Sequence, residues 1–168
     1  LQGLDKEAEK IAFIPRQYLA VIAVLLAIMM SVLDGTIMNI ALPTLAHDFD
    51  VTPSTAIWIV NAYQLVITMT LLSFASLGDI YGYRRIFLIG ISIFVGASLA
   101  CTLSTSFWML TAARVIQGFG AACVMSVNTA LIRLIYPPQI LGRGMGVNAM
   151  VVAVSAAAGP SIAGSILA

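Results

Sequence analysis

Two charged side chains, Asp34 and Arg114, lie inside apolar stretches of the sequence. Either ion costs several kcal/mol if it faces hydrocarbon, so such residues usually face the interior of a helix bundle or a watery cavity. Burial favours the protonated form of a carboxylate, whereas a nearby guanidinium favours the ionised form. A carboxylate under both influences can bind a proton in one conformation and release it in another. We therefore predict that Asp34 and Arg114 pair or share a hydrated cavity in a proton-responsive arrangement, with a static salt bridge as the alternative.

Three further polar side chains are predicted near the same layer. At a rise of ~1.5 Å per residue, Asp34 lies ~13 Å before Pro43, and Arg114 lies ~10 Å from the start of its own stretch. Asn61, Tyr63 and Gln64 reach a similar depth in a second stretch, so we interpret them as a cavity wall. The alternatives are interhelical hydrogen bonds for the amides and an interfacial aromatic belt for Tyr63.

The elements that position these residues are long apolar stretches. The chain has 168 residues, of which 61% are hydrophobic and 9% are charged, and its mean hydropathy is +1.04. Soluble domains carry roughly 25% charged residues. A bilayer-spanning helix needs about 20 apolar residues. Five stretches qualify, so we predict an all-α membrane protein with spans at 18–40, 56–77, 86–103, 107–131 and 147–168.

The basic residues predict an orientation for these spans. Lys and Arg gather in cytoplasmic loops of membrane proteins. Residues 1–17 form a polar leader that we place in the cytoplasm, followed by a transmembrane region at 18–168. Seven basic residues then fall on one face of the membrane: Lys6, Lys10, Arg16, Arg84, Arg85, Arg133 and Arg143.

Several functional classes find no support in the sequence. The net charge is +1 and no basic stripe is present, which argues against nucleic-acid binding. Cys101 and Cys123 share no metal or redox spacing and are interpreted as packing residues. The sequence contains no phosphate-binding loop motif, metal cluster or nucleophile–base pair, so we predict neither an enzyme nor a cofactor.

Four segments carry a family resemblance. Residues 33–43 read LDGTIMNIALP, residues 77–85 read LGDIYGYRR, residues 110–120 read LTAARVIQGFG, and residues 155–164 read SAAAGPSIAG. In this order they resemble motifs of the major facilitator superfamily, and specifically of its fourteen-helix multidrug branch. The resemblance covers nearly the whole chain.

The resemblance implies roles for individual residues. It ties Arg114 to proton coupling, makes Asp79, Gly82, Arg84 and Arg85 a gating loop, and makes Gly159, Pro160 and Gly164 an antiporter motif on a helix. Four positions depart from the family pattern. Ala75, Ser155 and Ala163 replace glycines, and Ile80 replaces a basic residue that makes a gating contact in the family.

The resemblance also implies a function. The chain is expected to be the N-terminal part, helices one to five, of a transporter of twelve or fourteen helices in the inner or plasma membrane. It would exchange protons for lipophilic, cationic drugs by alternating access, driven by the proton gradient, with membrane lipid and the rest of the transporter as partners. Two alternatives stay open: an uptake or facilitative transporter for a small metabolite, and a non-transporting receptor or assembly subunit.

Overall fold

The computed structural model describes residues 2–136, 139 and 141–167, with side chains described at 19–136, 139 and 141–164. Five helices and no strand occur in these residues, which confirms the predicted all-α fold. Each helix is long and apolar enough to cross a membrane. Their bounds are α1 (Gln2–Asp48), α2 (Pro53–Tyr81), α3 (Tyr83–Thr102), α4 (Phe107–Ile135) and α5 (Leu141–Leu167).

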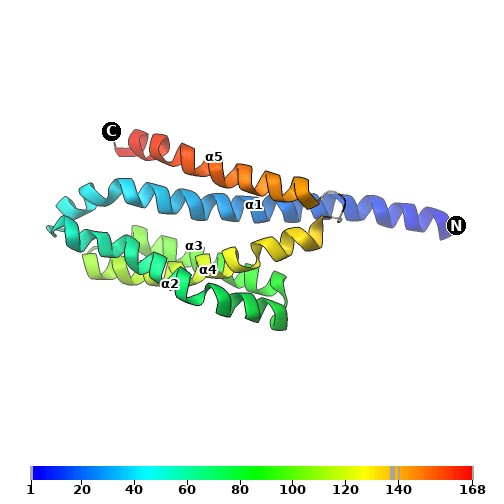
Figure 1. Cartoon of the computed structure of the whole chain (residues 1–168), viewed down its shortest axis with the longest axis horizontal. Helices are drawn as coiled ribbons and strands as arrows, with labels where there is room; N and C mark the ends of the chain where they lie inside the picture. The colour runs from blue at the N-terminus through cyan, green and yellow to red at the C-terminus, as the bar shows by residue number, and fades with distance from the viewer. Residues whose placement is uncertain (1, 137–138, 140, 168) are drawn as a thin grey trace.

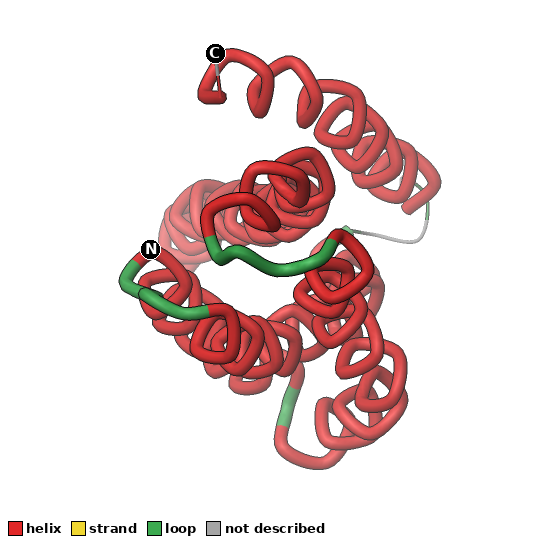
Figure 2. The backbone as a smooth tube through the Cα atoms, turned by 90° about the vertical axis from the view of Figure 1, so that its left-hand side faces the viewer, coloured by secondary structure: helices red, strands yellow, loops and turns green. Residues whose placement is uncertain are grey.

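The helices run roughly along one axis, with α1 and α5 side by side and α2, α3 and α4 grouped beyond α1 (Figure 1). The C-terminal helix lies at the edge of the bundle in the end-on view of Figure 2. α4 packs against α1, α2 and α3, whereas α5 packs mainly on α1. α4 is consequently the most buried of the five helices.

Small residues bring α3 and α4 into close contact. A Cβ atom added at Gly120 would lie 2.6 Å from the backbone nitrogen of Phe94, a distance that no real Cβ tolerates. Ala121 and Ala122 follow and are fully buried. Without a large hydrophobic driving force in lipid, helices gain van der Waals contact through such small residues.

The first helix is longer than the sequence predicted. The expected break at Pro43 is wrong, because α1 continues to Asp48. Proline removes only one backbone donor, and the remaining hydrogen bonds of the helix can continue around it. The turn occurs instead at Asp50, which has a φ of 50°, and α2 then starts at Pro53 with Thr52 as its N-cap. Asp34 therefore lies near the middle of the apolar segment Leu19–Asp48.

Two other predicted segments, the leader and the break at 136–144, are described only in part by the structure. The backbone of the predicted leader is helical from Gln2 and continuous with the first span, but its side chains lie outside the described part. The predicted break at 136–144 includes residues 137, 138 and 140, which also lie outside it.

Candidate functional site

Asp34 on α1 and Arg114 on α4 form an ion pair, and Gln117 joins both. Arg114 Nη1 donates to Asp34 Oδ2 at 2.5 Å and to Gln117 Oε1 at 2.7 Å. Gln117 Nε2 in turn donates to Asp34 Oδ1 at 3.0 Å. Both carboxylate oxygens therefore have a donor, and three side chains close a cyclic hydrogen-bond network that links α1 to α4. We call these three residues the charged cluster.

The charged cluster is buried chiefly on its α4 side. Arg114 is 0% exposed and Gln117 is 1% exposed, while the Asp34 side chain is 21% exposed. The Tyr63 ring of α2 lies under the guanidinium, with Arg114 Cζ 4.1 Å from the ring centroid, a cation–π contact. Two Arg114 nitrogens, Nε and Nη2, are buried without a hydrogen-bond partner among the described residues. The hydrogen-bonding capacity of the guanidinium is thus only partly used by its neighbours.

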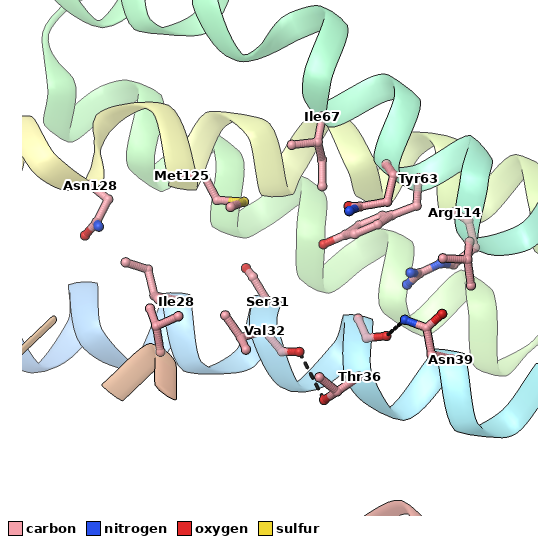
Figure 3. Close-up of a pocket in the computed structure, with 14 residues that line it drawn as sticks. Ile28, Ser31, Val32, Thr36, Asn39, Tyr63, Ile67, Arg114, Met125 and Asn128 are labelled. Atoms are coloured by element: carbon pink, nitrogen blue, oxygen red, sulfur yellow. Dashed lines mark hydrogen bonds between the residues drawn. The ribbon is translucent and has the colours of Figure 1, made fainter. Parts of the chain in front are cut away.

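A cavity of about 350 Å³ adjoins the charged cluster (Figure 3). Its wall is mostly apolar, with a few polar groups from α1, α2 and α4, the composition typical of small-molecule sites. Arg114 lines the cavity, whereas Asp34 is not among the lining residues and is bonded to Arg114 beside it. The lining residues are Ile28, Ser31, Val32, Gly35, Thr36 and Asn39 of α1, Val60, Tyr63, Gln64 and Ile67 of α2, Arg114, Met125 and Asn128 of α4, and Val152 of α5.

The structure separates the three residues that we interpreted as a cavity wall. Tyr63 is buried and lines the cavity, and Gln64 also lines it. Asn61 lies on the exposed side of α2 and is not among the lining residues. Tyr63 and Asn61 are two positions apart, about 200° around a helix, so they cannot share a face.

The sequence model of the protein family described as the Major Facilitator Superfamily matches residues 24–168 of this chain. The chain belongs to this superfamily. It is an integral membrane protein, in keeping with its five membrane-spanning helices in the described residues.

Three major facilitator relatives show how far the similarity extends. The chain is 59% identical to the uncharacterized transporter YebQ of Escherichia coli over 92% of its own length. It is 38% identical to the drug efflux pump JefA of Mycobacterium tuberculosis over 89%, and 36% identical to the riboflavin transporter RibZ of Clostridioides difficile over 90%. The chain covers 34%, 30% and 33% of these relatives respectively, so it spans about a third of their length. All three are named as transporters or pumps, which supports the prediction that the chain is not an enzyme.

The predicted gating loop of this major facilitator segment is a single-residue connection. α2 ends at Tyr81, α3 begins at Tyr83, and Gly82 between them has a φ of 92°, which favours glycine. The Tyr83 hydroxyl donates to Asp79, which ties the last turn of α2 to the first turn of α3. Arg84 and Arg85 are exposed, and Arg84 borders a separate, largely apolar hollow between α1, α3 and α4.

The major facilitator motif of α5 is divided between two faces of the helix. Gly159 is buried against α1, where an added Cβ would lie 2.0 Å from Thr36 Oγ1. Ser155 and Ala163, one turn to either side, are buried as well. Pro160 and Gly164 are exposed, and an added Cβ at Gly164 meets nothing within 4 Å. The two residues that replace family glycines thus share the packed face with Gly159.

Sequence reasoning did not select two polar residues of the site. Gln117 lies three positions after Arg114, so both project from neighbouring positions on α4. Asn128 follows Gln117 by eleven residues, which is close to three full turns and returns it to the same face. The periodicity of polar residues along this apolar helix was the signal that could have found both.

Proposed function

We propose that this chain forms the N-terminal part of a transporter that exports lipophilic, cationic compounds in exchange for protons, by alternating access. The observation that carries the proposal is the charged cluster beside the cavity, because it places a carboxylate that can bind a proton next to a space that can hold a small molecule. The similarity to the drug efflux pump JefA supports export of drugs.

The proposed mechanism assigns proton binding to Asp34 and its control to Arg114. A proton on Asp34 removes the negative charge that faces Arg114 Nη1. The guanidinium then keeps its charge in a buried position with one partner lost, which favours a different arrangement of α1 relative to α4. A cationic substrate in the cavity benefits from the ionised carboxylate. Proton and substrate therefore compete for the same negative charge, which is the requirement for exchange.

The gating loop and α5 have supporting roles in this proposal. The short α2–α3 connection makes the two helices move together, and the exposed Arg84 and Arg85 contact anionic headgroups. The Gly159 contact with α1 allows a tight seal that limits proton leak. We further propose that the N-terminus is cytoplasmic and that the inner or plasma membrane holds the protein, which the positions of the basic residues support.

A metabolite transporter is the second candidate, since the riboflavin transporter RibZ is nearly as similar to the chain as JefA is. The two functions differ in what the substrate requires of Asp34. A neutral substrate gains little from an ionised carboxylate, whereas a cationic substrate depends on it. Uptake that is independent of the proton gradient would favour the second candidate.

The test measures pH-dependent efflux of a cationic dye in inverted vesicles that contain the full-length transporter. Asp34→Asn keeps the shape of the side chain but removes its charge and its titration, so we expect export to be lost or reduced at least tenfold. Asp34→Glu retains a titratable carboxylate and should be milder, and Arg114→Ala should impair coupling. Asp48→Asn is the matched control, because Asp48 is an exposed acid on the same helix.

Expression level and thermal stability of each variant are measured in parallel, since loss of Asp34 leaves Arg114 without its carboxylate partner. The proposal is wrong if Asp34→Asn exports the dye at the parental rate and with the parental pH dependence.

A further inference from the structure

Asn128 lies in the cavity at the end remote from Arg114. Figure 3 shows the two residues at opposite ends of the view, with Met125 and Ile67 between them. Fourteen residues of α4 separate them, a distance of about 21 Å along the helix. The cavity therefore has two polar ends joined by an apolar middle, and only one end belongs to the charged cluster.

The Asn128 side chain has one partner and one unused acceptor. Its Nδ2 donates to Asn148 Oδ1 at 3.3 Å, which links α4 to α5. The residue is 7% exposed, and its Oδ1 is buried with no hydrogen-bond partner in the described part of the chain. Buried carbonyl oxygens of this kind are uncommon, because most buried polar atoms are paired. Asn128 lines the cavity, so a donor on the occupant is a partner that this buried oxygen lacks.

The neighbouring groups do not supply that donor. Ser31 lines the same cavity, but its hydroxyl donates to the Ala27 carbonyl oxygen at 3.0 Å. A hydroxyl has one hydrogen, so Ser31 can only accept a further bond from a guest. Ile28, Val32 and Met125, which line the cavity nearby, carry no side-chain hydrogen-bond donor. A molecule bound at this end of the cavity therefore contacts hydrogen-bond acceptors and aliphatic side chains.

We propose that Asn128 Oδ1 is a specificity-determining acceptor that selects, among lipophilic cations, those that carry an N–H or O–H donor. The inference rests on the proposed function and specifies the substrate class of the same cavity. A donor that enters the cavity loses its bond to water and regains one at Asn128. A cation without a donor leaves Oδ1 unpaired, so the preference amounts to roughly 2- to 10-fold in affinity.

The experiment compares two long quaternary cations that differ in one hydroxyl at the end remote from the charge. 10-(4-Hydroxyphenyl)decyltrimethylammonium has an O–H donor at that end, and 10-phenyldecyltrimethylammonium has none. Calorimetry measures the dissociation constant of each for the purified full-length protein in lipid nanodiscs. In Asn128→Leu, we expect the affinity for the hydroxyphenyl cation to fall roughly 2- to 10-fold while the affinity for the phenyl cation is retained.

Two further variants separate recognition from structure. Asn148→Ala breaks the same link between α4 and α5 but leaves Asn128 Oδ1 in place, so the ratio of the two affinities should stay parental. Asn128→Asp keeps an acceptor and should preserve or strengthen the preference for the hydroxyphenyl cation, which provides a readout if Asn128→Leu does not fold.

Three results would overturn the inference: equal changes for both cations in Asn128→Leu, the same loss of ratio in Asn148→Ala, or a parent protein that binds neither cation. The measurement needs no proton gradient. A transporter that lacks proton-driven export can therefore still show the predicted ratio, and an unchanged ratio leaves the export proposal standing.

Discussion

Gln117 converts an ion pair into a network with defined geometry. It accepts from Arg114 and donates to the second oxygen of Asp34, so the carboxylate is oriented from two sides. Breaking a buried pair by removing one partner is costly because it leaves an uncompensated charge. Gln117 is a neutral second partner for both residues, and in the proposed mechanism it is the partner that Arg114 keeps when Asp34 binds a proton. We infer that it supports the guanidinium through the proton cycle.

Gln117→Leu should therefore destabilise the protein by about 1–3 kcal/mol, because Asp34 Oδ1 and Arg114 each lose a partner in a buried site. The measurement is thermal unfolding of the purified full-length transporter. Gln64→Leu serves as the control, since the Gln64 side chain is exposed and lies outside the charged cluster. Equal unfolding temperatures for Gln117→Leu and the parent would contradict the role assigned to Gln117.

At the scale of elements, the contact between α1 and α5 depends on a stripe of small residues. Ser155, Gly159 and Ala163 recur every four residues and form one buried face. The family pattern has glycines at the outer two positions, and here the small side chains of Ser155 and Ala163 are accommodated. Only Gly159 faces a neighbour so closely that no side chain fits.

We predict that Gly159→Ala destabilises the α1–α5 contact by roughly 1–3 kcal/mol, the usual cost of overpacking. The new Cβ would collide with Thr36, so Thr36→Ala in the same chain should restore part of the loss. Gly164→Ala is the matched control on the same helix. It meets open space and should stabilise the helix slightly, because alanine is the better helix former. Thermal unfolding of the full-length protein compares the four chains, and equal behaviour of the two alanine variants would count against this packing.

At the scale of the whole molecule, the bundle has one buried helix and extensive exposed apolar surface. α4 is enclosed by α1, α2 and α3, whereas large apolar side chains such as Leu72, Leu99 and Met150 are exposed. In a membrane such surfaces contact lipid or further helices. The described ends of the bundle differ in charge, since Arg84, Arg85, Arg133 and Arg143 lie at the α2–α3 and α4–α5 ends.

The proposed orientation predicts how two single cysteines react with a membrane-impermeant thiol reagent added outside intact cells. The background is a full-length chain with Cys101→Ser and Cys123→Ser. His47→Cys lies near the end of α1 and should be labelled, whereas Gln139→Cys, between α4 and α5, should not. Both positions are exposed, so accessibility within the protein does not distinguish them. The reverse pattern would show that the N-terminus is outside.

The sequence by itself determined the fold class and the five helices of the described residues, and it singled out Asp34 and Arg114 as two charges that could pair or share a cavity. In hydrocarbon, an apolar segment can satisfy its backbone hydrogen-bonding groups within itself by forming a helix. Hydropathy alone therefore predicts membrane-spanning helices well. The two charges were found for the same reason, since an ion in an apolar stretch needs a partner. The helix ends were less predictable, as Pro43 shows, because one missing donor does not decide where a helix stops.

Only the tertiary structure decided which polar residues share the site. Gln117 and Asn128 became part of it because α4 lies at the centre of the bundle and turns one face toward α1. Asn61 was excluded because α2 turns its Tyr63 face inward. The same holds for the α5 motif, where Gly159 is packed and Gly164 is exposed. Sequence spacing shows which residues share a helix face, but the rotation of each helix about its axis depends on packing against its neighbours.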